Sequence, residues 1–270
     1  MEDMHLELKP GKTSDYEYTE AVKTLRTNIQ FCGSSVRVIM FTSAIPSEGK
    51  SDLSFATAEA LAQIGKRTLL IDADIRKSIL TYRYQLKNKL NGLSQFLSGQ
   101  KRLEEVLYTT STRGLDLIFA GPFSPNPAEL LEEELFGDTV KKLREAYDYI
   151  IIDTPPALSL LTVNAYVATD SLIIPMSPEI LSLLGVSQIK ETIESVRSYY
   201  NSRLRVLGIL LNKFSARLTL NREVLEMAEQ IAAQLDTRVF QSKIRGSVSV
   251  AESPAHGVSV LDYAPRSKPS

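Results

Sequence analysis

The most informative stretch for the fold of this chain is residues 36–51, Val-Arg-Val-Ile-Met-Phe-Thr-Ser-Ala-Ile-Pro-Ser-Glu-Gly-Lys-Ser. Residues 36–43 are rich in β-branched and aromatic side chains and predict a buried strand. Residues 53–62 carry apolar side chains at helical spacing and predict a helix. Between them lies a tight loop that ends in Gly-Lys-Ser. A strand, a tight loop and a helix N-terminus together form a phosphate-binding arrangement, because backbone N–H groups and the helix dipole point at one spot.

The residues of this loop predict how it holds the phosphates of ATP or a close relative. Gly49 lets the backbone approach a phosphate, Lys50 adds a cation for the β- and γ-oxygens, and the Ser51 hydroxyl ligates Mg²⁺. Ala44 replaces the glycine that often opens such loops, which requires only that its φ be negative. The Asp52 carboxylate would repel an α-phosphate, so we expect it to act as a helix-start charge. The predicted nucleotide-binding residues of the loop are Ala44, Ile45, Pro46, Ser47, Glu48, Gly49, Lys50, Ser51 and Asp52.

Two further apolar runs end in aspartates. Residues 68–74, Thr-Leu-Leu-Ile-Asp-Ala-Asp, and residues 147–153, Tyr-Asp-Tyr-Ile-Ile-Ile-Asp, both predict buried strands. Because parallel strands place their carboxyl ends on one edge, Asp72, Asp74 and Asp153 are expected beside the bound phosphates. Carboxylates there can hold Mg²⁺ or its waters and can orient or deprotonate an attacking hydroxyl. The predicted catalytic residues are Lys50, Asp72, Asp74 and Asp153, and the predicted Mg²⁺ ligands are Ser51, Asp72 and Asp153.

The remaining chain alternates short apolar runs with longer amphipathic stretches, which predicts an α/β fold. We expect one three-layer domain over residues 15–266, with a mostly parallel sheet and helices on both faces. Residues 1–14 and the tail 267–270 are expected to be mobile. Strands are predicted near 36–43, 67–73, 115–120, 148–153, 171–176, 205–212 and 238–242. Helices are predicted near 15–31, 50–64, 127–145, 179–200 and 220–235.

Composition narrows the functional classes. The 270 residues contain 31 Lys+Arg and 32 Asp+Glu, so net charge does not favour nucleic acid or an anionic membrane as a partner. The single cysteine, Cys32, excludes an internal disulfide, favours a cytoplasmic location, and is interpreted as a small buried apolar group. The apolar runs at 148–152, 171–176 and 206–211 are too short to span a bilayer, so no integral membrane segment is expected.

The order of these motifs is similar to that of the deviant-Walker P-loop ATPases, which include the ParA/MinD proteins and the bacterial tyrosine kinases (BY-kinases). Residues 15–156 resemble the cytoplasmic kinase domain of BY-kinases of the capsule or exopolysaccharide type. In that family a Glu-x2-Arg-x2-Arg helix assembles a ring, whereas this chain has Glu20, Lys23 and Arg26. Lysine lacks the bidentate geometry of arginine, and a solvated helix with charge pairs remains the alternative. The other matching segments are 71–76, 91–99, 121–131 and Asp-Thr-Pro-Pro at 153–156.

Residues 157–266 resemble the ParA/Soj partition ATPases instead. The matching stretches are 156–165, 211–224, 251–257 and 261–268. In ParA proteins a signature lysine near the start of the P-loop reaches the partner's nucleotide, but the matching residue here is Ile45. Arginines that help ParA bind DNA are also reduced, since the matching run is Arg-Gly-Ser-Val-Ser at 245–249. Both differences disfavour partition and DNA binding.

The kinase interpretation has a gap of its own. BY-kinases end in a tyrosine cluster that is autophosphorylated, whereas Tyr263 stands alone near the end of this chain. Asn212, after the apolar run 205–212, is similar to the adenine-reading asparagine of the superfamily, and a strand-end polar cap is the alternative. The remaining tyrosines considered, interpreted as packing or surface residues, are Tyr16, Tyr18, Tyr82, Tyr84, Tyr108, Tyr199 and Tyr200.

The resemblance therefore implies Mg-ATP-dependent phosphoryl transfer by a BY-kinase-like protein-tyrosine kinase linked to capsule or exopolysaccharide regulation. It also implies homo-oligomers and a membrane-anchored activator protein that would bring a cytoplasmic enzyme to the inner face of the membrane. Two alternatives remain open. One is a ParA/MinD-type ATPase switch for DNA partition or protein positioning, and the other is a nucleotide-binding scaffold with little turnover.

Overall fold

The computed structural model describes residues 4–7, 16–76, 78, 80, 90–122, 133–156 and 159–245. The strands are β1 (His5–Leu6), β2 (Val38–Phe41), β3 (Thr68–Asp72), β4 (Leu107–Thr110), β5 (Leu115–Ile118), β6 (Tyr149–Asp153), β7 (Ser171–Met176) and β8 (Arg205–Leu211). The helices are α1 (Tyr16–Phe31), α2 (Lys50–Gln63), α4 (Leu93–Leu97), α5 (Glu133–Ala146), α6 (Leu160–Ala168), α7 (Ile180–Tyr199) and α8 (Thr219–Gln234), and Leu103–Glu105 form the 3₁₀ helix η1.

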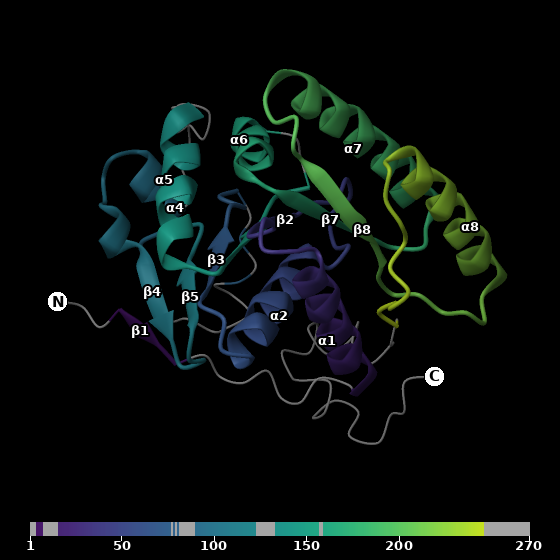
Figure 1. Ribbon diagram of the computed structural model, residues 1–270, viewed down its shortest axis with the longest axis horizontal. Coiled ribbons are helices and arrows are strands. Elements are labelled where there is room, and N and C mark those ends of the chain that lie inside the picture. Colours follow the sequence, from purple (N-terminus) through teal and green to yellow (C-terminus); the bar gives the residue numbers. More distant parts are fainter. Residues whose placement is uncertain are drawn as a thin grey trace.

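The strands form one sheet in the order β1-β4-β5-β3-β6-β2-β7-β8. Every neighbouring pair is parallel except β4 and β5, which are antiparallel. Helices α1 and α2 cover one face of the sheet, while α5, α6, α7 and α8 cover the other (Figure 1). The predicted three-layer α/β fold with a mostly parallel sheet is therefore confirmed.

The position of the central strands in the sheet explains why their sequences are uninterrupted apolar runs. Every residue of β2, β3 and β7 is buried, because helices pack on both faces of the sheet. One apolar cluster fills the layer under α5–α8, and a second fills the layer under α1 and α2. This packing fixes the carboxyl ends of β2, β3 and β6 at one edge, where the predicted phosphate site lies.

The segment after α8 differs from the sequence-based prediction. The predicted strand at 238–242 is wrong, because Val239 forms only an isolated bridge to Ile209 of β8. The Phe240 ring occupies the space where a Cβ on Gly208 would lie. The aromatic side chain thus packs across β8 at this point, and the pairing does not continue as a ladder.

Several short elements were not predicted at all. Strand β4, helices α4 and α6 and the 3₁₀ helix η1 are too short or too evenly apolar to give a clear periodic signal. Residues 5–6, inside the segment expected to be mobile, pair with β4 as β1. The predictions for Tyr82, Tyr84, Tyr263 and the tail 267–270 lie outside the described residues. Within the described part of the chain, no helix is both long enough and apolar enough to cross a membrane.

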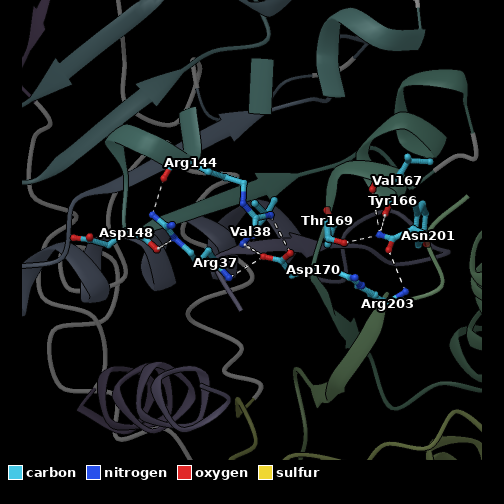
Figure 2. Close-up of polar contacts among 10 residues, drawn as sticks. All are labelled: Arg37, Val38, Arg144, Asp148, Tyr166, Val167, Thr169, Asp170, Asn201 and Arg203. Carbon is cyan, nitrogen blue, oxygen red and sulfur yellow. Dashed lines mark hydrogen bonds and ion pairs between the residues drawn. The ribbon is translucent and has the colours of Figure 1, made fainter. Parts of the chain in front are cut away.

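A polar network ties together the edge of the sheet opposite the predicted site (Figure 2). Asp170 Oδ2 accepts hydrogen bonds from the backbone N–H groups of Arg37 and Val38, at 2.9 and 2.8 Å. Asp170 Oδ1 pairs with the Arg144 guanidinium at 2.9 Å. The Asn201 amide donates to the three carbonyls at the end of α6, those of residues 166, 167 and 169. These contacts join β2, α5 and α6 at positions far apart in sequence.

Replacing Asp170 with Ala is expected to lower the free energy of unfolding by roughly 2–3 kcal/mol. The change leaves two backbone N–H groups at the start of β2 without their acceptor and removes the partner of Arg144. Urea denaturation measures the loss. Asp138→Ala is the matched control, because Asp138 is exposed on α5 and should change stability by less than about 0.5 kcal/mol. Equal stability of the two variants would contradict the prediction.

Candidate nucleotide-binding site

The predicted loop leaves the central strand β2 and enters the first turn of α2. Gly49 is the N-cap of α2, with φ 87° and no side-chain cap, and Ser47 also has a positive φ of 64°. Ala44 has no positive φ, as the sequence predicted. Because Gly49 has no capping side chain, the first N–H groups of α2 remain available to a ligand, and the helix dipole favours an anion there.

Neighbouring elements brace the loop closely from two sides. A Cβ on Gly49 would overlap Asn212 Nδ2, and a Cβ on Gly185 of α7 would overlap the Ala44 Cβ. A side chain at residue 185 would therefore displace the loop from α7, whereas one at residue 49 would displace the Asn212 amide and would also have to adopt a positive φ. The close packing fixes the loop against β8 and α7 before any ligand binds.

Glu48 is the loop residue whose buried side chain links the loop to the segment after β7. Its side chain is buried, and its two carboxylate oxygens accept hydrogen bonds from the backbone N–H groups of Ile45 and Ser177, at 3.3 and 3.2 Å. The Glu48 carbonyl accepts a hydrogen bond from Asn212 Nδ2 at 3.0 Å. The sequence predicted Glu48 only as a loop member, and the structure places it as the brace of the loop.

Lys50 lies folded against the loop. Only 6% of its surface is exposed, and its Nζ donates to Ser43 Oγ at 2.8 Å. Ser43 Oγ in turn donates to the Ile45 carbonyl at 2.9 Å. Burial lowers the pKa of Lys50, and the negative charges of Asp153, Glu48 and Asp74 oppose that shift. Ser43 was not singled out from the sequence, because serines at strand ends are common and carry no motif.

Asp72 and Asp153 lie side by side at the ends of β3 and β6. They are register partners in the sheet, and each is 1% exposed. Burial raises the pKa of Asp72 to about 7, while hydrogen bonds from the Ser78 hydroxyl and the Asp74 backbone N–H act in the opposite direction. Burial and then the charge of Asp72 raise the pKa of Asp153 to about 8. The two carboxylates thus form a buried pair with unfavourable mutual repulsion.

This pair fits a divalent cation. Asp153 Oδ1 is buried and makes no hydrogen bond in the structure, while the Ser51 hydroxyl interacts with the Asp153 carboxylate. The described residues hold no cluster of three or more His, Cys, Asp or Glu that could ligate a metal by themselves. Mg²⁺ commonly binds through one or two carboxylates together with water and substrate phosphates, so this donor set fits a metal that arrives with a nucleotide.

The remaining predicted residues surround this centre. Asp52 lies in the first turn of α2, the position of a helix-start charge, and Asp74 is half-buried beside Asp72. Asn212 Oδ1 accepts a hydrogen bond from the Lys213 backbone N–H at 2.9 Å, and its Nδ2 bonds to the loop. These contacts match the polar-cap alternative, and adenine reading by Asn212 stays a prediction. Lys213 is exposed, and its Nζ donates to the carbonyl of residue 47 at 2.9 Å, a contact that the sequence did not predict.

The chain matches a known protein family over most of its sheet. A family model described as an AAA domain matches residues 36–206, which include the loop, both aspartate-bearing strands and β7. The chain belongs to this family of P-loop proteins.

The chain is similar to tyrosine kinases, to sporulation and partition proteins, and in structure to a synthase. The tyrosine-protein kinase CpsD of Streptococcus agalactiae is 35% identical over 213 residues, covering 78% of this chain and 89% of the relative. The sporulation initiation inhibitor protein Soj of Bacillus subtilis is 30% identical over 238 residues, covering 86% of this chain and 93% of the relative. The structure of cobyrinic acid a,c-diamide synthase from Mycobacterium smegmatis with bound ADP and magnesium has a TM-score of 0.67 and 25% identity over 83% of this chain and 97% of its own. Both kinds of relative predicted from the sequence are confirmed.

Replacing Gly49 with Ala is expected to lower the free energy of unfolding by roughly 1–2 kcal/mol. The alanine would have to adopt the left-handed backbone conformation of Gly49, and its Cβ would overlap the Asn212 amide. The double variant Gly49→Ala/Asn212→Ala should recover the steric part of the loss and keep the backbone part. Gly137→Ala is the matched control: a Cβ there has no neighbour within 4 Å and lies in the helix α5, so stability should stay equal or rise. Thermal melting of the wild type and these variants measures the differences, and a Gly49→Ala protein as stable as the wild type would contradict the prediction.

Proposed function

We propose that this chain is a Mg-ATP-dependent phosphoryl-transfer enzyme, a BY-kinase-like protein-tyrosine kinase linked to capsule or exopolysaccharide regulation. The observation that carries this proposal is the buried pair Asp72 and Asp153 beside the P-loop, with Lys50 folded over the same edge. Such a pair is unfavourable without a cation, and it lies where the phosphates of a bound nucleotide would bring one. The 35% identity to CpsD over 89% of that kinase supports the kinase class.

Each residue of the site then has a role. The N–H groups at the start of α2 bind the β- and γ-phosphates, and Lys50 leaves Ser43 to pair with their oxygens. Ser51 and Asp153 would hold Mg²⁺, which would neutralise charge that develops on the phosphates. Asp72, whose pKa is raised to about 7, orients the attacking hydroxyl and accepts its proton. The carboxylate of Asp74 lies next to Asp72 and completes this part of the site.

A ParA/MinD-type switch is the second candidate, because Soj is 30% identical over 93% of its own length. Residue 45 argues against the nucleotide-sandwich dimer of that class. Ile45 is half-buried, and its Cγ1 lies 3.7 Å from the position that a Cβ on Gly185 would take. An apolar side chain packed toward α7 cannot supply a cation to a second nucleotide.

The proposal extends to partners by family resemblance. We infer that the protein forms homo-oligomers and acts at the inner face of the membrane through a membrane-anchored activator protein. Binding of DNA is disfavoured, since the acidic and basic residues are nearly balanced, 32 against 31.

One experiment separates the candidate functions. Purified protein is incubated with Mg-ATP, with and without DNA, and phosphate release and phosphotyrosine are measured, the latter by mass spectrometry. Phosphotyrosine that is absent from Lys50→Ala but present in the control Lys142→Ala, an exposed lysine of α5, supports the kinase. Hydrolysis stimulated by DNA without phosphotyrosine would establish the partition-type switch instead. Measurable ATP binding with neither product would indicate a scaffold.

A further inference from the structure

A hollow rich in arginine lies at the edge of the sheet opposite the P-loop. Its volume is about 480 Å³, and its basic lining residues are Arg197, Arg205 and Arg238. Arg205 is the first residue of β8, whereas the P-loop follows the last residue of β2 in the same parallel direction. Arg197 lies in the last turn of α7, and Arg238 follows the end of α8. The three arginines thus meet from separate elements at a place that the proposed phosphoryl transfer does not use.

The carboxyl ends of α7 and α8 do not take up the charges of these arginines. At the end of α8, the backbone N–H groups of residues 235–237 donate to the free carbonyls of the last turn. Arg197 Nε donates to the Leu204 carbonyl at 2.8 Å, outside α7. Arg205 and Arg238 are exposed and make no ion pair in the part of the chain that the structure describes. Two guanidinium groups therefore remain available to an anion.

The positive charge of the hollow also acts on the thiol of Cys32. Burial raises the pKa of the Cys32 thiol, while the charges of Arg238 and then Arg205 act to lower it. Cys32 follows α1 and is half-buried. The single cysteine of the chain therefore lies within the electrostatic field of the hollow, which makes its reactivity a measure of charge there.

The rest of the lining indicates the kind of anion. Val206 and Leu207 add apolar surface, and the volume lies within the range of small-molecule sites, roughly 300–1,000 Å³. Asp236 also lines the hollow, so the lining keeps a net positive charge, which attracts a dianion more strongly than a monoanion. An aryl phosphate meets these conditions, because its dianion pairs with arginine forks and its ring packs on apolar side chains.

We propose that this hollow binds an aryl phosphate, the phosphorylated side chain of a tyrosine. Tyr199 and Tyr200 at the end of α7 are one source, since they are 81% and 68% exposed and Tyr200 follows Arg197 by three residues. A phosphate at a helix C-terminus is unfavourable unless arginines pair with it, which the hollow provides. A phosphotyrosine of another protein is the other source. The choice of tyrosine rests on the proposed function, while the anion site itself does not.

Direct binding tests the proposal. Isothermal titration calorimetry with O-phosphotyrosine is carried out on the wild type, on Arg205→Gln/Arg238→Gln, and on the control Arg203→Gln, an exposed arginine outside the lining. We expect the double variant to bind at least about tenfold more weakly and the control to bind as the wild type does. Equal binding by all three proteins, equal affinity for inorganic phosphate, or preferential binding of short duplex DNA at these arginines would each overturn the proposal.

Cys32 provides a second, independent readout. Bound phosphotyrosine cancels the arginine charges, so the pKa of the Cys32 thiol should rise and its alkylation by neutral iodoacetamide should slow severalfold at about pH 8. The double variant should react slowly even without ligand and should no longer respond to it. An alkylation rate that is the same with and without phosphotyrosine, and the same in the wild type and the double variant, would overturn the proposal.

Failure of the site is distinguishable from failure of the proposed kinase activity. Both measurements use added phosphotyrosine and therefore do not depend on phosphoryl transfer by this chain. They are repeated on Lys50→Ala protein, which should bind phosphotyrosine as the wild type does even though it lacks the proposed kinase activity. Mass spectrometry and Cys32 alkylation of wild-type protein after incubation with Mg-ATP then separate the two sources of ligand. Slower Cys32 alkylation after incubation with Mg-ATP that is lost in Tyr199→Phe/Tyr200→Phe identifies this chain as the source, whereas binding of added phosphotyrosine with no phosphate on Tyr199 or Tyr200 rules these two tyrosines out.

Discussion

Asp153→Asn is expected to stabilise the protein without ligand by roughly 3 kcal/mol at about pH 8 and to abolish its stabilisation by Mg-ATP. The gain arises because Asp153 is buried beside Asp72, and its pKa is raised from 3.8 to about 8. The asparagine removes both the cost of a buried charge and the repulsion between the two carboxylates. The loss arises because the amide cannot replace a charged oxygen as a metal ligand.

The pH dependence gives this prediction a defined sign. Between about pH 4 and pH 8 the unfolded chain has released protons that the folded Asp72 and Asp153 retain, so the unfolded state binds fewer protons. Their contribution to stability is therefore fully present below about pH 4 and is lost as the pH rises toward about 8. The stability difference between Asp153→Asn and wild type should grow across this window, measured by urea denaturation at several pH values. Asp138→Asn, at an exposed position, is the control and should show no such trend. A difference that shrinks with rising pH would contradict the assignment.

Lys50→Ala is expected to lower the rate of phosphoryl transfer by roughly 10²–10³-fold. Lys50 is the buried cation of the loop, and no other lysine or arginine among the described residues is buried. Its charge would act on phosphate oxygens from a side chain that is only 6% exposed, where electrostatic interactions are less screened than in water. Lys50→Arg should restore little activity, because a planar guanidinium cannot place its charge where Lys50 Nζ lies, 2.8 Å from Ser43 Oγ.

Two measurements separate the roles of Lys50. Single-turnover formation of phosphotyrosine reports the chemical step, and fluorescence titration with a labelled ATP analogue reports binding. We expect the rate to fall much further than the affinity, because the lysine is needed most when charge develops on the transferred group. Full activity in Lys50→Ala would contradict the assigned site, and Lys142→Ala serves as the control for loss of a surface lysine.

The local parts of the site could be predicted because they depend on neighbouring residues. The strand, the loop and the helix start lie within residues 36–63, and the room for a close phosphate at Gly49 follows from the missing side chain of glycine. The aspartates at 72 and 153 were also predictable, since parallel strands share an edge. The isolated bridge at Val239 in place of a predicted strand shows the limit, because the contact of Phe240 with Gly208 joins residues that are far apart in sequence.

The amino-acid pattern was enough to predict the fold class and the phosphate loop, because apolar periodicity and glycine chemistry act over short distances, and the resemblance of the motifs indicated the family. Packing of distant elements is needed to see that Glu48 braces the loop, that Asn212 contacts Gly49, and that the two aspartates are register partners. It also decided that arginines from α7, β8 and the segment after α8 meet around one hollow. Burial and electrostatic coupling depend on which elements pack together, and that packing is a property of the whole folded chain.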